Sequence, residues 1–433
     1  MVSAAIIIGA LLVAALLALT PRIRRSSAWK ATVTPLSSIM GSGFLVSAPL
    51  VAAEAGLYAP LAMAGLLVVA FAIGGMIRFN IRYAEPEAEG GGEPSDAGSD
   101  AHRAHRGHHQ RSRGHWSGAQ PRLTGTLEKA SHVVLAVAYV VSVTYYLQLL
   151  SAFALDRFGV ADLLWSRVLC TAVLGGITAV GAVWGLKALE GLETWAVSLN
   201  LGMIAALLVA LAVHDGTLLA SGDLALPELQ PDPDLPHAAR IVMGLLIVVQ
   251  GFETSRFLGD EHSADERIRT MRTAQILASV IYLAFVTLTL PLFDASHLDA
   301  DVTAIVRLVA PVAVALPTLI VVTAVGSQLS AAVADDAACA GLLRTFFRGR
   351  VRARWSYLGI GALTIGLTWL TDVLEIISLA SRAFALFYAL QCAVALLTAR
   401  GREDAPHRRW VMGLAGALAL LSLAIAVLGI PAE

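Results

Sequence analysis

The chain has 433 residues, of which 57% are hydrophobic, and its formal net charge is -1. The mean hydropathy is +0.71, and apolar runs of about 20 residues recur along the whole length, as in proteins that cross a membrane many times. The near-zero net charge gives no reason to expect a nucleic-acid or an acidic partner. We therefore expect an all-α polytopic membrane protein.

Hydropathy predicts about twelve transmembrane helices. The first apolar run is followed, not preceded, by a basic cluster, so we interpret it as a helix with its N-terminus outside rather than as a cleaved signal peptide. The predicted spans are residues 2–20, 32–53, 57–80, 130–155, 163–184, 192–213, 238–258, 273–293, 317–342, 356–371, 374–398 and 410–429.

The loops between these spans alternate in charge. Most of the 31 Lys and Arg residues lie in or beside the loops after the odd-numbered helices, whereas residues 215–234 and 294–301, on the opposite side, are acidic. Positively charged loops stay in the cytoplasm. We predict a multi-pass protein of the cytoplasmic membrane with both termini external.

One long polar stretch, residues 84–122, is rich in Gly, Glu, Ser, Arg and His. It lacks the apolar content to fold alone and is predicted to be a disordered cytoplasmic loop. Its histidines suggest metal sensing as an alternative, but their spacing fits no defined metal site and the intervening arginines oppose a cation, so we favour a solvated tether. These histidines are His102, His105, His108, His109 and His115.

The cysteines give no support for redox chemistry. Cys170, Cys339 and Cys392 all fall inside apolar spans and form no CxxC pattern, so we expect packing residues, with no disulfide, metal site or cofactor.

Glycines interrupt two of the predicted spans, each near the start of a comparable run of helices. Backbone groups freed at membrane depth are tolerated where they face a cavity or a ligand, so the breaks predict a binding site. The alternative is that the glycines only permit close helix packing; their paired positions favour binding. The residues at the breaks are Gly41, Ser42, Gly43 and Phe44 in the first, and Gln250, Gly251, Phe252 and Glu253 in the second.

The order of these features resembles the amino acid–polyamine–organocation (APC) permeases. The glycine break at 41–43, the break at 251–253 running into Gly259-Asp260-Glu261, and the basic stretch at 267–269 follow one another as in that family. The resemblance spans roughly residues 30–400. It departs from the family at Pro49, which comes one residue late, and at Asn200, which stands where some proton-coupled relatives place a lysine.

This resemblance implies a LeuT-like core of two inverted five-helix repeats, with one extra helix at each end. It also implies a secondary active transporter that moves an amino acid or a related small organic amine by alternating access, and not an enzyme. The implied units are residues 1–31, 32–215, 237–400 and 401–433.

The physics of a broken helix suggests how such a substrate would be held. The N–H groups that begin the second half of the first broken helix, at residues 42–44, suit a carboxylate. Carbonyl oxygens around Val249 and Gln250 suit an ammonium group, so together they would hold a zwitterion. Phe252 is interpreted either as a gate or as packing, and the hydroxyls of the third core helix either orient substrate or bond neighbouring helices. Those hydroxyls belong to Tyr139, Ser142, Tyr145 and Tyr146.

Charged groups within spans each need a partner or a purpose. Glu253 either pairs with Arg256, three residues on, or carries a proton. Adjacent Asp335 and Asp336 project about 100° apart on a helix, so they cannot share one partner. Arg382 is expected to pair with one of the three carboxylates, because an unpaired guanidinium in hydrocarbon costs at least ~2.5 kcal/mol.

Ser327 and Ser330 give a competing mechanism of coupling. Three residues apart on the eighth core helix, they match the positions where sodium-dependent members of the wider fold use hydroxyl ligands, although serines in membrane helices are also packing residues. The coupling ion, H+ or Na+, stays open at this point. The alternative functions are a non-transporting sensor or an ion-conducting protein with the same fold.

Overall fold

The computed structural model describes residues 2–20, 26–41, 43–85, 120–160, 162–184, 190–227, 235–258, 262–293, 301–347, 350–403 and 405–431. This part of the chain is helical throughout and contains no strand, which confirms the predicted all-α class. The long polar stretch lies outside it except at its ends, as do Ser42 and residues 259–261.

Every one of the twelve predicted spans contains helix. Among the described residues, eight helices are long and apolar enough to cross a membrane. Four predicted spans are not counted separately among them: α1, α14 and the two broken segments. The second half of the first broken segment, α4, belongs to one of the eight, Phe44–Tyr83. The bounds are α1 (Val2–Leu19), α3 (Ser27–Gly41), α4 (Phe44–Ala55), α5 (Ala59–Tyr83), α7 (Gln120–Asp156), α8 (Leu163–Val183), α9 (Glu190–Ser221), α10 (Leu235–Gly244), α11 (Ala264–Thr289), α12 (Ala304–Leu308), α13 (Leu316–Phe346), α14 (Ala353–Leu370), α15 (Val373–Gly401) and α16 (Arg408–Leu428), with short 3-10 helices η1 (Gly56–Tyr58), η3 (Leu246–Val249), η4 (Phe252–Phe257) and η5 (Leu290–Leu292).

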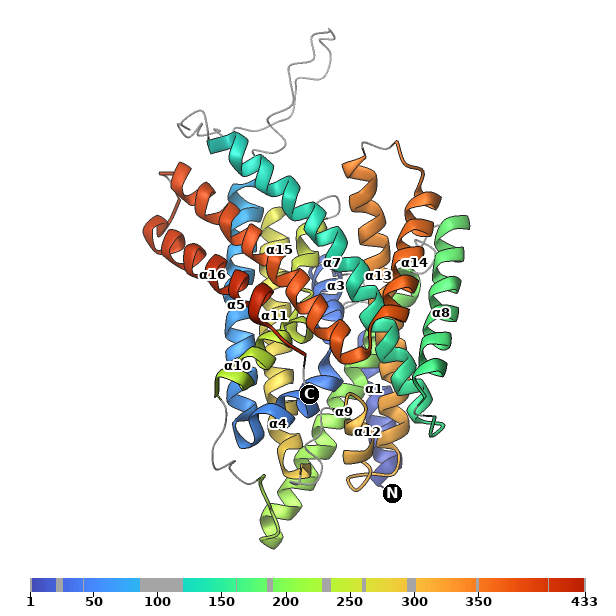
Figure 1. Ribbon diagram of the computed structural model, residues 1–433. Helices are drawn as coiled ribbons and strands as arrows, with labels where there is room; N and C mark the ends of the chain where they lie inside the picture. The colour runs from blue at the N-terminus through green and yellow to red at the C-terminus, as the bar shows by residue number, and fades with distance from the viewer. Residues whose placement is uncertain are drawn as a thin grey trace.

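The helices form an upright bundle whose connections alternate between its two ends (Figure 1). α5 and α7 approach the upper end, where α13 and α14, and α15 and α16, are also joined. The short helix α12 lies at the lower end, near the N-terminus. The ends of α5 and α7 and the connections that follow α13 and α15, where the sequence is basic, therefore share one end of the bundle.

α7 is the central helix of the bundle. Of its most apolar window 83% is buried, against 17% for α8 at the edge. α7 packs against α13 and α15. Its small polar side chains form hydrogen bonds with carbonyls of the same helix, as when the Ser151 hydroxyl donates to the Leu147 carbonyl at 2.8 Å. Such hydroxyls let helices approach closely without leaving a polar group unpaired.

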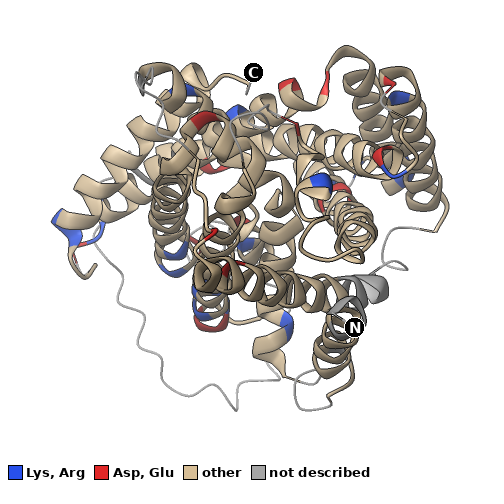
Figure 2. Ribbon diagram, turned by 90° about the horizontal axis from the view of Figure 1, so that it is seen from below, with Lys and Arg blue, Asp and Glu red and all other residues tan. Residues whose placement is uncertain are grey.

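Charge is confined to a few places on the bundle. Viewed from below, most of the ribbon carries neither acid nor base (Figure 2). An Arg82–Asp265 ion pair joins the ends of α5 and α11, and Arg307 of α12 pairs with Asp156 at the opposite end, 3.3 Å apart. Ion pairs thus tie helix ends together at both ends of the bundle, where water lowers the cost of charge.

The chain's last helix ends against the first part of a broken one. The Ile430 backbone N–H donates to the Arg240 carbonyl at 3.2 Å, and a Cβ on Gly244 would lie 2.0 Å from the Ile430 oxygen. The absence of a side chain at Gly244 therefore permits this contact between α10 and the segment after α16.

Glycine also sets the contact between α1 and α9. A Cβ on Gly202 would lie 2.4 Å from the carbonyl oxygen of Ala10 and 2.9 Å from the nitrogen of Ala14. Both are backbone atoms, which cannot rotate away. α1 is therefore held against α9 at a position that accepts no larger residue.

Gly202→Val should lower stability by about 1–3 kcal/mol, because the added side chain forces α1 away from α9. Gly216→Val on the same helix is the matched control, since a Cβ there meets nothing within 4 Å. Melting both variants in detergent measures the difference. Equal melting temperatures would show that α1 does not depend on this contact.

Candidate functional site

The first broken helix changes direction at the predicted glycines. α3 ends at Gly41 and α4 begins at Phe44. The first helical bond of the new segment runs from the Ser47 N–H to the Gly43 carbonyl, at 3.0 Å. The N–H groups just before Ser47 thus precede the hydrogen-bonded ladder of α4 and form the positive end of its dipole, which favours an anionic group.

The second broken helix stops at Gly244 and continues only as 3-10 turns on either side of Gly251. Gly251 has a φ of 116° in the left-handed region, and a Cβ there would lie 2.5 Å from the Ser38 hydroxyl and 2.6 Å from the Ile39 nitrogen. Both its conformation and its surroundings therefore require glycine. The second break rests directly on the helix that leads into the first.

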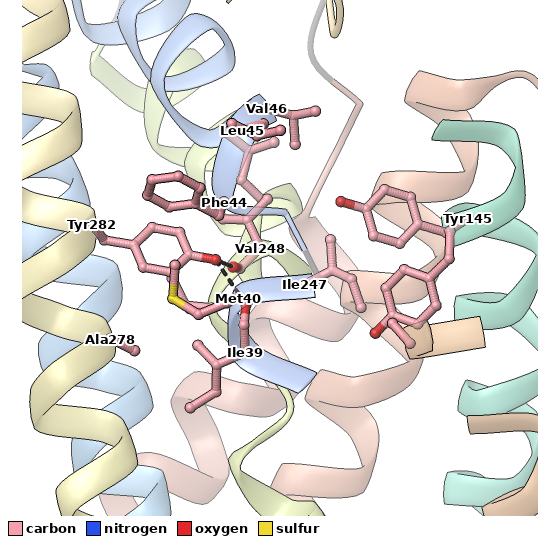
Figure 3. Packing of buried hydrophobic residues seen from close by; sticks show 14 of the residues in the cluster. Ile39, Met40, Phe44, Leu45, Val46, Tyr145, Ile247, Val248, Ala278 and Tyr282 are labelled. Carbon is pink, nitrogen blue, oxygen red and sulfur yellow. Dashed lines mark hydrogen bonds between the residues drawn. The ribbon is translucent and has the colours of Figure 1, made fainter. Parts of the chain in front are cut away.

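Tyr282 of α11 holds the two breaks together. Its hydroxyl donates to the Ile39 carbonyl at 2.9 Å and also lies against the Val248 carbonyl, as Figure 3 shows. A hydroxyl has one proton, so it serves one of the two carbonyls at a time. The rings of Phe44 and Tyr282 meet edge to face, with centroids 5.5 Å apart. One side chain thus contacts a backbone carbonyl from each broken helix.

Glu253 follows directly on the second break and is fully buried. One of its oxygens, Oε2, accepts hydrogen bonds from the Gly251 N–H at 3.0 Å and from the Tyr388 hydroxyl at 2.9 Å. The other, Oε1, has no hydrogen-bond partner in the described structure. The ring of Phe252 stacks on Tyr388 at 5.3 Å. A buried carboxylate with a free oxygen calls for a proton or a cation.

A second buried carboxylate, on α13, lies beside α7. Asp335 of α13 accepts hydrogen bonds from Ser142 and Tyr146, and the Tyr146 hydroxyl in turn accepts from the Gln250 amide at 2.8 Å. Asp335 therefore connects through Tyr146 to the second break.

Tyr139, one helical turn before Ser142 on α7, has a buried hydroxyl without a hydrogen-bond partner in the described structure. Glu253 and Asp335 both act on it electrostatically. We call the whole set the acidic cluster: Glu253, Asp335, Tyr139, Ser142, Tyr146, Gln250 and Tyr388.

A layer of ion pairs closes the end of the bundle beyond this cluster. The Arg256 guanidinium pairs with Glu128 and, at 3.4 Å, with Glu85. Arg267 of α11 pairs with Glu85 at 2.7 Å. Arg256 also donates to the Gln391 amide oxygen of α15. Arg256 thus takes its acids from other helices, and the sequence-based alternative of a pair with Glu253 is wrong.

The sequence matches one known protein family over most of its length. A family described as APC superfamily transporter matches residues 21–429. The chain belongs to the APC superfamily of transporters. It is therefore a multi-pass membrane protein that carries a small molecule and not an enzyme.

The transporter is also similar to individual proteins. It is 36% identical over 387 residues to an uncharacterized protein of Aquifex aeolicus (strain VF5), covering 89% of this chain and 88% of that one. Among solved structures, a manganese transporter of Eremococcus coleocola bound to an aromatic bis-isothiourea compound superposes with a TM-score of 0.57 at 11% identity, covering 94% of this chain and 87% of that one. A mutant form of the same manganese transporter gives 0.56 at 11%, with coverage of 92% and 85%. At this identity the likeness shows the fold alone.

The structure brings most of the predicted substrate residues of the transporter together. A Cβ on Gly43 would lie 2.7 Å from Val248 and 2.9 Å from the Tyr145 hydroxyl, so the two broken helices and α7 meet at this glycine. Phe252 and Glu253 follow Gly251, which packs on Ser38 and Ile39 just before the first break, and both contact Tyr388. The predicted contribution of Ser42 lies outside the described residues.

The residues predicted for ion coupling are more scattered. Ser327 of α13 is half-buried, and its carbonyl oxygen would lie 3.5 Å from a Cβ on Gly41; its hydroxyl donates to Ala324 of its own helix at 3.2 Å. Ser330 is half-buried on the same helix. Asn200 is buried on α9, and Asp336 is buried with its Oδ1 unpartnered in the described structure. Of these, Ser327 lies beside the first break and Asp335 belongs to the acidic cluster.

The predicted ion pair of Arg382 is wrong. Its side chain is exposed, and its Nε donates to the Ala426 carbonyl at 2.9 Å. None of the ion pairs between described residues includes it. Ala426 lies in the last turn of α16, where carbonyls have no partner within the helix and attract a cation. The C-terminal end of α16, whose partial negative charge comes from backbone carbonyls and not from an acidic residue, therefore takes the place of the expected carboxylate.

Sequence reasoning missed three residues that the site depends on. Tyr282 and Tyr388 are tyrosines within apolar helices, and no sequence pattern distinguishes them from packing residues. Gln391 bonds Asn80, Ser131 and Arg256. A buried glutamine within an apolar run was a usable signal, because an amide in hydrocarbon needs partners.

Gly43→Leu should abolish substrate binding while the protein still inserts and folds, because the side chain would occupy the meeting point of Val248 and Tyr145. Gly65→Leu on α5 is the control, since a Cβ there meets nothing within 4 Å. Ligand-induced thermal shifts of both purified variants measure the effect. A shift in Gly43→Leu equal to that of the wild type would remove this break from the binding site.

Proposed function

We propose that this APC superfamily member is a secondary active transporter that moves an amino acid or a related small organic amine across the cytoplasmic membrane by alternating access. The observation that carries the proposal is the free, buried oxygen of Glu253 directly beside two broken helices that meet each other. If Glu253 had only a structural role, we would expect it to form an ion pair with a Lys or Arg side chain. In the described structure its partners are neutral hydrogen-bond donors, the Gly251 N–H and the Tyr388 hydroxyl.

The substrate class follows from what the two breaks offer. The N-terminal end of α4 suits a carboxylate group. The carbonyl of Val248, which Tyr282 contacts, and the acidic cluster suit an ammonium group. The manganese of the structural neighbours belongs to those proteins, and among the described residues no three His, Cys, Asp or Glu side chains come together as metal ligands.

The close contact at Gly43 supports alternating access. In the described arrangement Val248 fills the space beside this glycine, and the ion pairs of Arg256 and Arg267 close one end of the bundle. A substrate that used the backbone at 43–44 would require the two broken helices to separate. We propose that substrate entry and release accompany that separation.

The same reasoning extends to the organisation of the core. We propose two inverted repeats of LeuT type at residues 32–215 and 237–400, each beginning with a broken helix, with residues 1–31 and 401–433 as additions. The basic loops, including 84–122, would face the cytoplasm and both termini would be external. Cysteine labelling from either side of the membrane would test this orientation.

Glu253→Gln should reduce uptake at least tenfold, because the amide keeps the size of the side chain but cannot take up a proton or hold an ammonium ion. The measurement is uptake of radiolabelled substrate into proteoliposomes, with candidate amino acids and amines first chosen by a thermal-shift screen. Imposing a pH gradient or a sodium gradient identifies the coupling ion.

Glu403→Gln is the matched control, since Glu403 lies exposed in the turn after α15. Unchanged uptake in Glu253→Gln would contradict the proposed role of this carboxylate. Two other outcomes would replace the proposed function. Binding without uptake would indicate a sensor, and a steady current in planar bilayers would indicate an ion-conducting protein.

A further inference from the structure

A groove of about 880 Å³ runs along the outside of the bundle between α5, α11 and α16. These three helices lie side by side in Figure 1, and α5 packs against the other two. The groove is separate from the acidic cluster and shares no residue with it. The residues used below are Arg78, Arg82 and Arg272 at its upper end, Val68 and Val280 lower down, and Trp410 at the rim.

Three arginines line the upper end of the groove, of which Arg82 is neutralised by its ion pair with Asp265. Arg272 is exposed and lies close enough to Arg78 to repel its guanidinium. The described partners of Arg78 are neutral: the Gln275 amide oxygen, the Phe71 carbonyl at 3.3 Å and the Phe71 ring, whose centroid lies 4.9 Å from the guanidinium carbon. No ion pair between described residues includes Arg272. Arg78 is buried in the wall of the groove and Arg272 is exposed beside it. Two like charges without an acid between them attract an anion.

The rest of the groove is apolar and faces outward. Val68 is 68% exposed and Val280 is 61% exposed. The stretch of α5 that lines the groove, from Ala64 to Tyr83, is roughly 28 Å long at 1.5 Å per residue. One leaflet with its head groups is about 20–22 Å thick, so the groove is long enough for a head group and the acyl chain below it.

Aromatic residues mark the level of the membrane surface at this end. Trp410 is 67% exposed at the rim, and the Arg402 guanidinium lies over the ring of Tyr83 at 5.7 Å. Tryptophan and tyrosine gather at the depth of lipid head groups. The arginines therefore lie where a lipid phosphate lies, and the valines lie where its acyl chain lies.

We propose that the groove between α5, α11 and α16 is a binding site for one anionic phospholipid, whose phosphate sits between Arg78 and Arg272 and whose acyl chain packs on α5 and α11. The head group of a zwitterionic lipid carries a positive charge next to its phosphate. Such a lipid would therefore offset less of the repulsion between Arg78 and Arg272 than an anionic lipid does. Basic pockets between membrane helices recognise anionic head groups in this way.

The test is lipid binding by native mass spectrometry of the purified full-length protein, with phosphatidylglycerol and phosphatidylcholine of the same acyl chains. We expect preferential retention of phosphatidylglycerol. Arg272→Gln should weaken phosphatidylglycerol binding about fivefold, the equivalent of one surface arginine, and leave phosphatidylcholine binding unchanged. Arg344→Gln is the control, because this exposed arginine lies at the end of α13, outside the groove.

A second variant tests the apolar half without changing charge. Val68→Trp fills the groove below the arginines and should also reduce retention of phosphatidylglycerol. The proposal is overturned if Arg272→Gln and Val68→Trp both bind phosphatidylglycerol like the wild type, or if Arg344→Gln loses as much as Arg272→Gln. Displacement of the lipid by glycerol phosphate at equal concentration would also overturn it, because a free anion would then suffice.

Discussion

The contact of Gly251 with the backbone at Ser38 and Ile39 is the constraint on which the centre of this transporter depends. Two helices that stop within a membrane leave backbone groups without partners, and lipid supplies none. Here the two interruptions meet, and Tyr282 bonds the carbonyls that they free. A side chain at residue 251 would separate the breaks, so the conformational freedom of one glycine determines whether the backbone of both helices is satisfied.

The acidic cluster follows from the same arrangement. Because the second broken helix continues only as 3-10 turns, its side chains project toward α15 and α7 rather than along one face. Glu253 thereby reaches Tyr388, and Gln250 reaches Tyr146. Interrupted helices expose polar backbone and place polar side chains at the same depth, and both features suit a ligand that carries charges of both signs.

Hydropathy and glycine patterns were sufficient to predict the helices and the position of both breaks, because each helix in a membrane must be apolar along its length and each interruption needs a residue without a side chain. They were not sufficient for tertiary partners. Arg382 was expected to find a carboxylate and instead bonds a helix end at Ala426, and Arg256 pairs with Glu85 and Glu128 on other helices rather than with Glu253. The tertiary packing decides which helix ends lie next to each other, and the sequence patterns used here do not predict that packing.

The segment after α16 has a consequence for how the molecule can be observed. The Ile430 backbone bonds the Arg240 carbonyl and lies against Gly244, so this segment is attached to the helix that leads into the second break. A fluorophore placed just beyond this attachment would travel with α10, whereas one placed on α8 would stay with the periphery of the bundle. The distance between these two labels would therefore report movement of α10 relative to α8.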